Sequence, residues 1–244
     1  MKTLLAVAAL LLAMHANSFA AETDCAIFQA GNRILFQGDS ITDGGRGRNS
    51  DPNHVLGHSY AYLVAARYGA LYPERHLAFF NRGVSGNKVP DLLNRWQTDT
   101  IDLKPTVVSI LIGVNDIWHP LNEGKEVSVE NYEEGYDKLL AQTIAALPNV
   151  KIILLEPFIT PGRATTPKWD VWQEHLKKFQ TVAAKLGAKY HLPVVKLQKV
   201  FDDACQRAPA EYWVFDGVHP TNVGSQLIAG QWVRVAAATW PVAK

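Results

Sequence analysis

The sequence predicts an α/β protein, a single-domain three-layer α/β/α sandwich with a central parallel sheet of about five strands. Short apolar runs rich in β-branched residues alternate with amphipathic helical patterns along the chain. Most of these runs are apolar at successive positions, which is typical of strands buried on both faces of a parallel sheet. The 244 residues contain no internal repeat and no linker rich in Pro, Gly or Ser that would divide two domains.

Five apolar runs predict the strands, at residues 34–37, 77–80, 107–112, 152–155 and 192–197. Right-handed crossovers between parallel strands place helices on both faces of the sheet. In sheets of this kind ligands bind beyond the carboxyl ends of the strands. Polar residues that directly follow these runs are therefore candidates for a functional site.

Four amphipathic patterns predict the main helices, at residues 59–68, 132–147, 169–186 and 222–237. Pro148 ends the second of them, and Gly187 is expected to cap the third.

The N-terminus predicts a secretory signal peptide over residues 1–21, followed by one domain over residues 22–244. Lys2 supplies a positive start, and residues 4–14 form an apolar run that is too short to span a bilayer. Small residues around Ala20 offer a cleavage site. We therefore expect an exported protein, periplasmic or secreted, without stable membrane insertion.

The two cysteines of the mature chain, Cys25 and Cys205, are an even number in an expected oxidising compartment. A disulfide between them is the prediction, although two unrelated buried thiols also fit the sequence. Such a bridge would tie the mature N-terminus to the segment that precedes Asp216.

The charge balance excludes one broad class of partner. The formal net charge is +1 and no basic block occurs, so there is no electrostatic footprint for nucleic acid. The sequence does not decide between a monomer and a homo-oligomer.

Four short segments carry residue types suited to acyl transfer. Three follow predicted strands: residues 38–42 (Gly-Asp-Ser-Ile-Thr), 83–87 (Gly-Val-Ser-Gly-Asn) and 113–116 (Gly-Val-Asn-Asp). A serine on a strand-to-helix turn, as Ser40 would be, exposes its hydroxyl next to a helix N-terminus, which favours developing negative charge.

The fourth segment, residues 216–220, reads Asp-Gly-Val-His-Pro. An Asp three residues before a His can bend back to the imidazole N–H, which fixes the tautomer and leaves the other nitrogen free as a base. Each segment alone also fits a turn, a helix cap or a loop ion pair. All four together, in this order, are not easily explained as turns.

Together the four segments resemble the signature blocks of the SGNH hydrolases, also called GDSL esterases and lipases. The resemblance extends from Asn32 to about Gly224, with Ile41 where the eponymous motif has Leu. It implies the flavodoxin-like SGNH hydrolase fold, a serine esterase that forms an acyl-enzyme, and no metal or organic cofactor. The roles it implies are a catalytic triad of Ser40, Asp216 and His219 and oxyanion-hole donors from Ser40, Gly86 and Asn115.

Within this superfamily the chain is most similar to bacterial acetylxylan esterases, on residues 38–43, 81–87 and 112–118. This similarity implies acetyl esters of carbohydrates, such as acetylated xylan or oligosaccharides, as substrates. A periplasmic lysophospholipase or thioesterase acting on longer acyl chains is the second reading. A catalytically silent carbohydrate-binding module is the third, and the intact triad residues count against it.

Two aromatic side chains are candidates for substrate binding. Trp118 and Trp213 lie close in sequence to Asn115 and Asp216, so we expect them to wall the cleft, where flat rings suit sugars.

Two other features are interpreted as structural. His54 and His58 are four residues apart but lack the Glu of a zinc-protease helix, so we expect helix-surface histidines and no metal site. Asp39 and Asp116 are expected to accept hydrogen bonds from backbone N–H groups near the site.

Overall fold

The central sheet is parallel throughout. The computed structural model describes residues 24–49 and 51–242, and the predicted signal peptide over residues 1–21 lies outside them. Within this part the strands follow the order β2-β1-β3-β4-β5. Their bounds are β1 (Arg33–Gly38), β2 (Ala78–Asn81), β3 (Val107–Leu111), β4 (Lys151–Leu155) and β5 (Val194–Val195). The predicted α/β sandwich with a five-stranded parallel sheet is confirmed.

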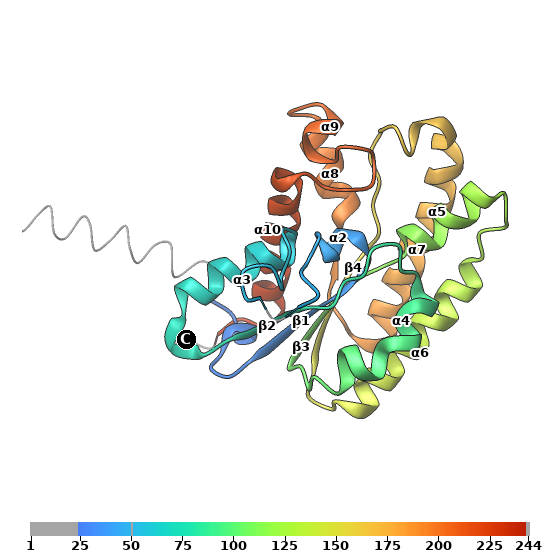
Figure 1. Cartoon of the computed structure of the whole chain (residues 1–244). Coiled ribbons are helices and arrows are strands. Elements are labelled where there is room, and N and C mark those ends of the chain that lie inside the picture. Colours follow the sequence, from blue (N-terminus) through green and yellow to red (C-terminus); the bar gives the residue numbers. More distant parts are fainter. Residues whose placement is uncertain (1–23, 50, 243–244) are drawn as a thin grey trace, which may run out of the picture.

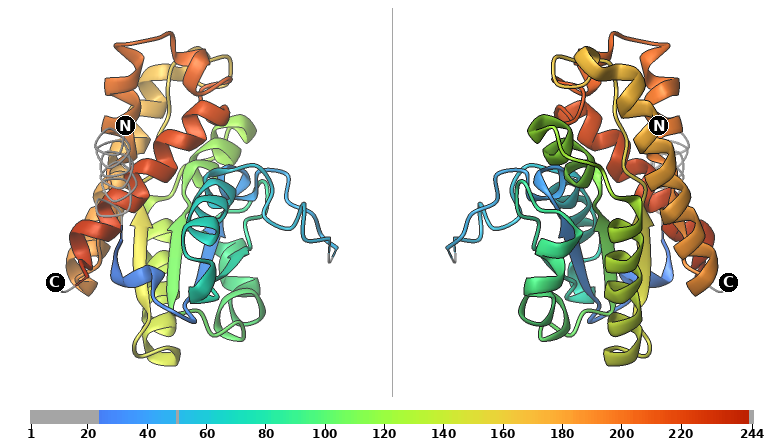
Figure 2. Two further views of the ribbon diagram at one scale, coloured as in Figure 1. Left: turned by 90° about the vertical axis from the view of Figure 1, so that its left-hand side faces the viewer. Right: turned by 90° about the vertical axis from the view of Figure 1, so that its right-hand side faces the viewer.

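Helices cover both faces of the sheet (Figures 1 and 2). One face carries α3 (Tyr60–Leu71) and α10 (Asn222–Thr239), and the other carries α4 (Val89–Trp96), α6 (Val129–Ala146) and α7 (Trp169–Tyr190). Buried indole groups tie the layers together: Trp232 of α10 donates to Ser109 Oγ of β3 at 3.0 Å, and Trp96 of α4 donates to Thr143 Oγ1 of α6 at 2.8 Å.

Shorter helices, which lie outside the four predicted amphipathic patterns, complete the connections. They are α2 (Ser40–Asp43), α5 (Val114–Glu123), α8 (Leu197–Cys205) and α9 (Ala210–Trp213). The described chain also contains short 3₁₀ helices and one π-helical turn. The 3₁₀ helices are η1 (Ala26–Phe28), η2 (Pro73–Arg75) and η4 (Thr166–Lys168), and the π-helical turn is η3 (Gln97–Ile101).

The predicted end of the third amphipathic helix at Gly187 is wrong. Helix α7 continues to Tyr190, and His191 ends it in the left-handed conformation with φ 54°. Gly187 has a packing role instead, because a Cβ there would lie 2.4 Å from Cγ2 of Val194 on β5.

The strand order explains where the functional segments meet. β1 pairs with β2 on one side and with β3 on the other, so the segments that follow β2 and β3 flank the segment that follows β1. Ser40 follows β1, Gly86 follows β2 and Asn115 follows β3. All three therefore reach the same edge of the sheet, the edge at which α2 lies in Figure 1.

The predicted disulfide is also wrong, because Cys25 and Cys205 are free cysteines. Cys25 pairs through its backbone with Pro241, near the amino-terminal edge of the sheet. Cys205 ends α8, beyond the carboxyl edge, so the two thiols lie at opposite ends of the molecule (Figure 1). A disulfide requires Cα atoms within about 7 Å of each other.

Candidate active site

An open cleft at the carboxyl edge of the sheet exposes the hydroxyl of Ser40. Its walls come from the segment after β1, the loop before α3 and the chain around His219. The lining residues are Ser40, Ile41, Gly44, Gly45, His58, Ser59, Ser85, Arg163, Phe215, Asp216, His219, Pro220 and Ser225.

Ser40 is placed at the start of α2 by a tight strand-to-helix turn. Gly38 is required there, because a Cβ would lie 2.2 Å from the Leu111 carbonyl oxygen of β3. Asp39 caps α2 by accepting a hydrogen bond from Ile41 N at 2.9 Å. The serine hydroxyl therefore stands at a helix N-terminus, as the sequence predicts.

Ser40, His219 and Asp216 form a continuous chain of hydrogen bonds. Ser40 Oγ lies 2.9 Å from His219 Nε2, and His219 Nδ1 lies 2.7 Å from Asp216 Oδ2. The other oxygen, Asp216 Oδ1, accepts the backbone N–H groups of Val218 at 2.9 Å and of His219 at 2.8 Å. The short spacing between Asp216 and His219 thus folds back on itself as expected.

The Asp216 carboxyl is buried, yet its surroundings favour the charged form. Burial acts to raise its pKa, but the hydrogen bonds from His219 and Val218 outweigh this and lower the pKa to about 2. A carboxylate in this position keeps a proton on Nδ1 and leaves Nε2 to face the Ser40 hydroxyl.

Gly86 and Asn115 flank the serine from the two neighbouring strands. Asn115 is 4% exposed, and its Nδ2 donates to the carbonyl oxygen of Asn87 at 3.2 Å. Gly86 has φ +81°, a conformation that favours glycine, and Val84 N beside it donates to Gly38 O at 3.1 Å. The structure therefore brings Ser40, Gly86 and Asn115 to one place.

Two further carboxyls near the serine have pKa values raised well above the ordinary range of an aspartate. Burial raises the pKa of both Asp39 and Asp116 to about 7. Asp39 accepts from Ile41 N, and Asp116 Oδ1 accepts from Val89 N at 3.1 Å. The expectation that both accept backbone hydrogen bonds is confirmed.

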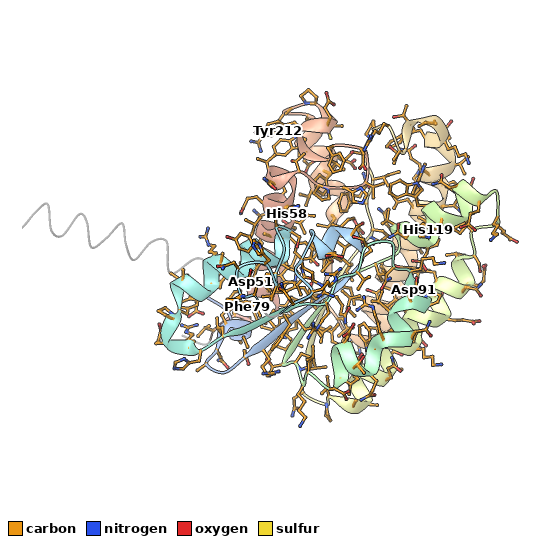
Figure 3. All side chains as sticks on the ribbon, viewed as in Figure 1. Asp51, His58, Phe79, Asp91, His119 and Tyr212 are labelled. Atoms are coloured by element: carbon orange, nitrogen blue, oxygen red, sulfur yellow. The ribbon has the colours of Figure 1, made fainter. Side chains whose placement is uncertain are left out.

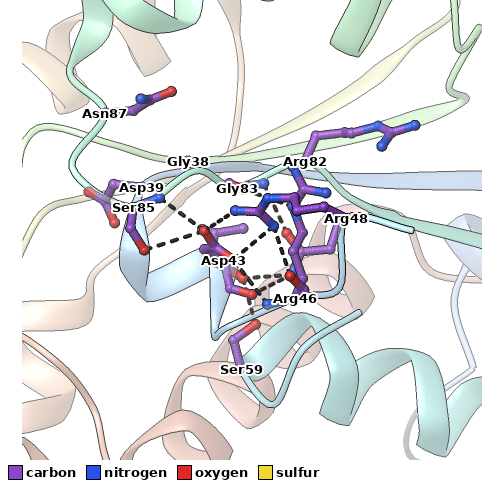
Figure 4. Close-up of polar contacts among 12 residues, drawn as sticks. Gly38, Asp39, Asp43, Arg46, Arg48, Ser59, Arg82, Gly83, Ser85 and Asn87 are labelled. Carbon is purple, nitrogen blue, oxygen red and sulfur yellow. Dashed lines mark hydrogen bonds and ion pairs between the residues drawn. The ribbon is translucent and has the colours of Figure 1, made fainter. Parts of the chain in front are cut away.

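A buried network that the sequence analysis missed joins Asp43 to the loop that carries Gly86 (Figure 4). Asp43 accepts hydrogen bonds from Ser85 N at 3.0 Å and from Arg46 N at 3.0 Å, and it pairs with Arg48 at 2.5 Å. Asn81 adds a second link, because its Nδ2 donates to the Thr42 carbonyl at 2.7 Å. Nothing in the local sequence pattern signals the contacts of Asp43 with Ser85 and of Asn81 with Thr42, which join residues about 40 positions apart.

The two tryptophans predicted to bind substrate lie in different surroundings. The Trp118 ring centroid is 5.7 Å from that of His219 and 6.2 Å from that of Trp172. Trp213, on α9, is 7% exposed and packs against Tyr212. Neither Trp118 nor Trp213 is among the residues that line the cleft, so the lining does not bear out the prediction that both wall it.

Phe215 lines the cleft although the sequence analysis did not single it out. Its ring is 51% exposed and stacks on His219 at 5.7 Å with an interplanar angle of 21°. The Arg163 guanidinium lies 5.9 Å from the centroid of the same ring. Its position in the sequence could have identified it, since Phe215 directly precedes Asp216.

The histidines set aside as helix-surface residues lie in turns, so that expectation is wrong. His54 and His58 both precede α3, and His58 lines the cleft (Figure 3). In the part of the chain that the structure describes, no three His, Cys, Asp or Glu side chains are grouped to hold a metal ion. None of the helices described there combines the length and apolar character that crossing a bilayer requires.

Comparisons with known proteins identify relatives over most of the chain. The profile of the GDSL-like lipase/acylhydrolase family matches residues 36–227. An acetylxylan esterase of Geobacillus stearothermophilus is 33% identical over 218 residues, which cover 86% of this chain and 96% of that protein.

Solved structures are also similar over most of the chain. A crystal structure from Parabacteroides merdae, described as a GDSL-like lipase, has a TM-score of 0.82 at 40% identity and covers 86% of this chain and 97% of its own. A catalytic mutant of the Geobacillus acetylxylan esterase has a TM-score of 0.76 at 31% identity, over 85% of this chain and 95% of that chain.

Proposed function

The chain belongs to the GDSL-like lipase/acylhydrolase family and is a carboxylic ester hydrolase, and we propose that Ser40, His219 and Asp216 are its catalytic triad. The observation that carries this proposal is the continuous chain of hydrogen bonds from the Ser40 hydroxyl through the His219 ring to the Asp216 carboxylate.

A relative supports the assignment. Three solved variants of the Geobacillus acetylxylan esterase are described as catalytic mutants, and they replace a serine, an aspartate and a histidine. In that enzyme the aspartate precedes the histidine by three positions, as Asp216 precedes His219 here.

The proposed mechanism follows from the geometry. His219 Nε2 accepts the Ser40 proton as Oγ attacks the ester carbonyl, and Asp216 stabilises the imidazolium that results. The carbonyl oxygen becomes an oxyanion, which accepts hydrogen bonds from Ser40 N, Gly86 N and Asn115 Nδ2. His219 then gives its proton to the leaving alcohol. Water, activated by the same histidine, releases the acid from Ser40.

Replacement of the nucleophile tests the triad. Ser40→Ala should fold normally but lose at least roughly a thousandfold in kcat, because the packing barely changes and the attacking oxygen is gone. The measurement is hydrolysis of a chromogenic acetyl ester, with circular dichroism to verify folding. Turnover near that of the wild type would contradict the proposal.

We propose acetyl esters of carbohydrates as the substrate class. The relative with this activity in its name matches over nearly its whole length. The cleft around Ser40 is open, is lined largely by small and polar side chains, and carries the exposed Phe215 ring at its rim. Such a surface suits a small acyl group on a hydroxylated ring better than a long alkyl chain.

An acyl-chain-length series tests the substrate class. We expect kcat/KM to be highest for acetyl esters and to fall at least roughly tenfold by octanoyl, with acetate released from acetylated xylooligosaccharides. A series that peaks at octanoyl or longer, with no acetate released, would instead support a lysophospholipase or thioesterase.

Export remains a proposal based on the N-terminal sequence alone, on Lys2 and the apolar residues 4–14. N-terminal sequencing of the mature protein tests it, and we expect a start near residue 22. A retained Met1 in the native host would contradict it.

A further inference from the structure

We propose that Asp43 is a positioning residue of this active site, which holds the loop that carries Gly86 at a fixed distance from Ser40. The inference rests on the proposed function, because it takes Gly86 N as an oxyanion donor. Asp43 is 2% exposed and is not among the residues that line the cleft. It therefore acts through its neighbours and not on the substrate.

Asp43 connects the two halves of the proposed oxyanion hole. It is the last residue of α2, the four-residue helix that Ser40 begins. Its Oδ2 accepts hydrogen bonds from the backbone N–H of Ser85 at 3.0 Å and from the Ser85 hydroxyl at 3.3 Å. Ser85 directly precedes Gly86, so the carboxylate fixes one side of the glycine.

Asn115 fixes the other side. Its Nδ2 donates to the carbonyl oxygen of Asn87, the residue that follows Gly86. Asn87 N donates in turn to Val84 O at 3.1 Å and closes the turn. Gly86 thus lies between two anchored residues, and the anchors come from the segments that follow β1 and β3.

The Asp43 carboxylate is suited to this task because it satisfies several donors at once. Oδ1 accepts from Arg46 N, Arg48 pairs with both oxygens, and Arg46 Nε donates to the Gly83 carbonyl at 2.8 Å (Figure 4). Burial acts to raise the pKa of Asp43, but Arg48 and Ser85 hold it below its ordinary value. A neutral amide of the same size offers one acceptor oxygen and turns an NH2 group toward these donors.

The isosteric variant Asp43→Asn tests the role. We expect kcat for an acetyl ester to fall roughly tenfold while KM changes less than about twofold. A displaced Gly86 N–H stabilises the oxyanion of the transition state less well, and it has little effect on binding of the uncharged ester. An unchanged kcat, or an effect confined to KM, would overturn the inference.

Glu156→Gln is the matched control. Glu156 is also a buried carboxylate paired with a half-exposed cation, since the side-chain exposures are 6% and 53% for Glu156 and Lys196 and 3% and 51% for Asp43 and Arg48. It lies after β4, away from the Gly86 loop, so its loss should leave kcat unchanged.

A double variant separates positioning from a general loss of stability. Asn115→Ala removes one donor and also releases Asn87, so it should lower kcat by roughly 10²–10³ and already free one side of Gly86. Adding Asp43→Asn to Asn115→Ala should then lower kcat by less than about a further threefold. If the two substitutions acted independently, their separate losses in kcat would multiply. Full multiplication of the two losses would overturn the inference.

A replacement variant and a comparison with Ser40→Ala complete the test. If Asp43→Asn does not fold, Arg48→Gln takes its place, because it leaves the carboxylate but removes a guanidinium that pairs with both of its oxygens. It should show the same sub-multiplicative coupling to Asn115→Ala, and full multiplication there would also overturn the inference. Activity retained in Ser40→Ala would mean that the proposed function itself fails, whereas an inactive Ser40→Ala beside an unaffected Asp43→Asn would remove only the role of Asp43.

Discussion

Hydrogen bonds, rather than burial alone, decide the charge of each aspartate around Ser40. Asp39, Asp43, Asp116 and Asp216 are all buried. Asp43 and Asp216 receive several donors and have lowered pKa values, whereas burial raises the pKa of Asp39 and Asp116 to about 7. The carboxylates with lowered pKa values are thus those that contact His219 and the Gly86 loop.

The lowered pKa of Asp216 predicts a pH-dependent contribution to stability. Because its pKa falls from 3.8 to about 2 on folding, the contribution is present above pH 3.8 and is lost as the pH falls through about 2. The difference in free energy of unfolding between the wild type and Asp216→Asn should therefore shrink between pH 5 and pH 2. Urea unfolding at each pH measures it, and a constant difference would contradict the prediction.

The exposed ring of Phe215 predicts a role in binding the sugar. Phe215→Ala should raise KM for acetylated xylooligosaccharides about five- to tenfold, since aromatic packing contributes on the order of 1 kcal/mol, and leave methyl acetate hydrolysis unchanged.

Tyr212→Ala is the control for Phe215, because Tyr212 is 53% exposed against 51% for Phe215 but lies on α9 outside the cleft lining (Figure 3). Equal effects of the two variants on KM for the oligosaccharides would exclude a specific platform at Phe215.

The sequence predicted the residues of the site that sit in contiguous motifs and missed those that act across loops. Ser40, Asn115 and His219 each stand at a recognisable strand end or turn. The contacts of Asp43 with Ser85 depend on how two distant loops pack. No local period or spacing encodes such packing.

Among the helices and strands, length decided what could be predicted. Long periodic segments such as α6 and α7 were found, while α2 and α9 have four residues each and show no period. The start of α5 was not predicted as a helix, because Gly113, Asn115 and Asp116 are also common turn residues. Gly187 was predicted to cap the helix, because glycine is common at that position. Its actual role, a close contact with Val194, depends on tertiary packing and is not visible in the local sequence.

The packing of α7 against β5 predicts opposite effects for two helical glycines. Gly187→Ala should destabilise the protein by about 1–3 kcal/mol, because the new Cβ would lie 2.4 Å from Cγ2 of the partly buried Val194. Gly230→Ala on α10 should stabilise it by about 0.5–1 kcal/mol, because nothing lies within 4 Å and alanine favours the helix. Urea unfolding compares the two, and the same sign for both would contradict this account.

For the molecule as a whole, the alternation of strands and helices was enough to predict the layers, but not which distant segments meet. The cysteine prediction rested on an even count, which carries no spatial information. Cys25 precedes β1 and pairs with Pro241 near the amino-terminal edge of the sheet, whereas α8 follows β5 beyond the carboxyl edge, and this arrangement separates the two thiols.

The separation of the cysteines predicts two thiols of different reactivity. Cys25 is fully buried, and burial raises its pKa to about 11, whereas Cys205 at the end of α8 is partly exposed. A thiol-specific reagent acts on the thiolate, so the folded protein should react with about one equivalent, slowly, and the second should appear only on unfolding. Because no bridge constrains the unfolded chain, dithiothreitol should leave the melting temperature unchanged. The absence of titratable thiols in unreduced, denatured protein would contradict this prediction and restore the disulfide.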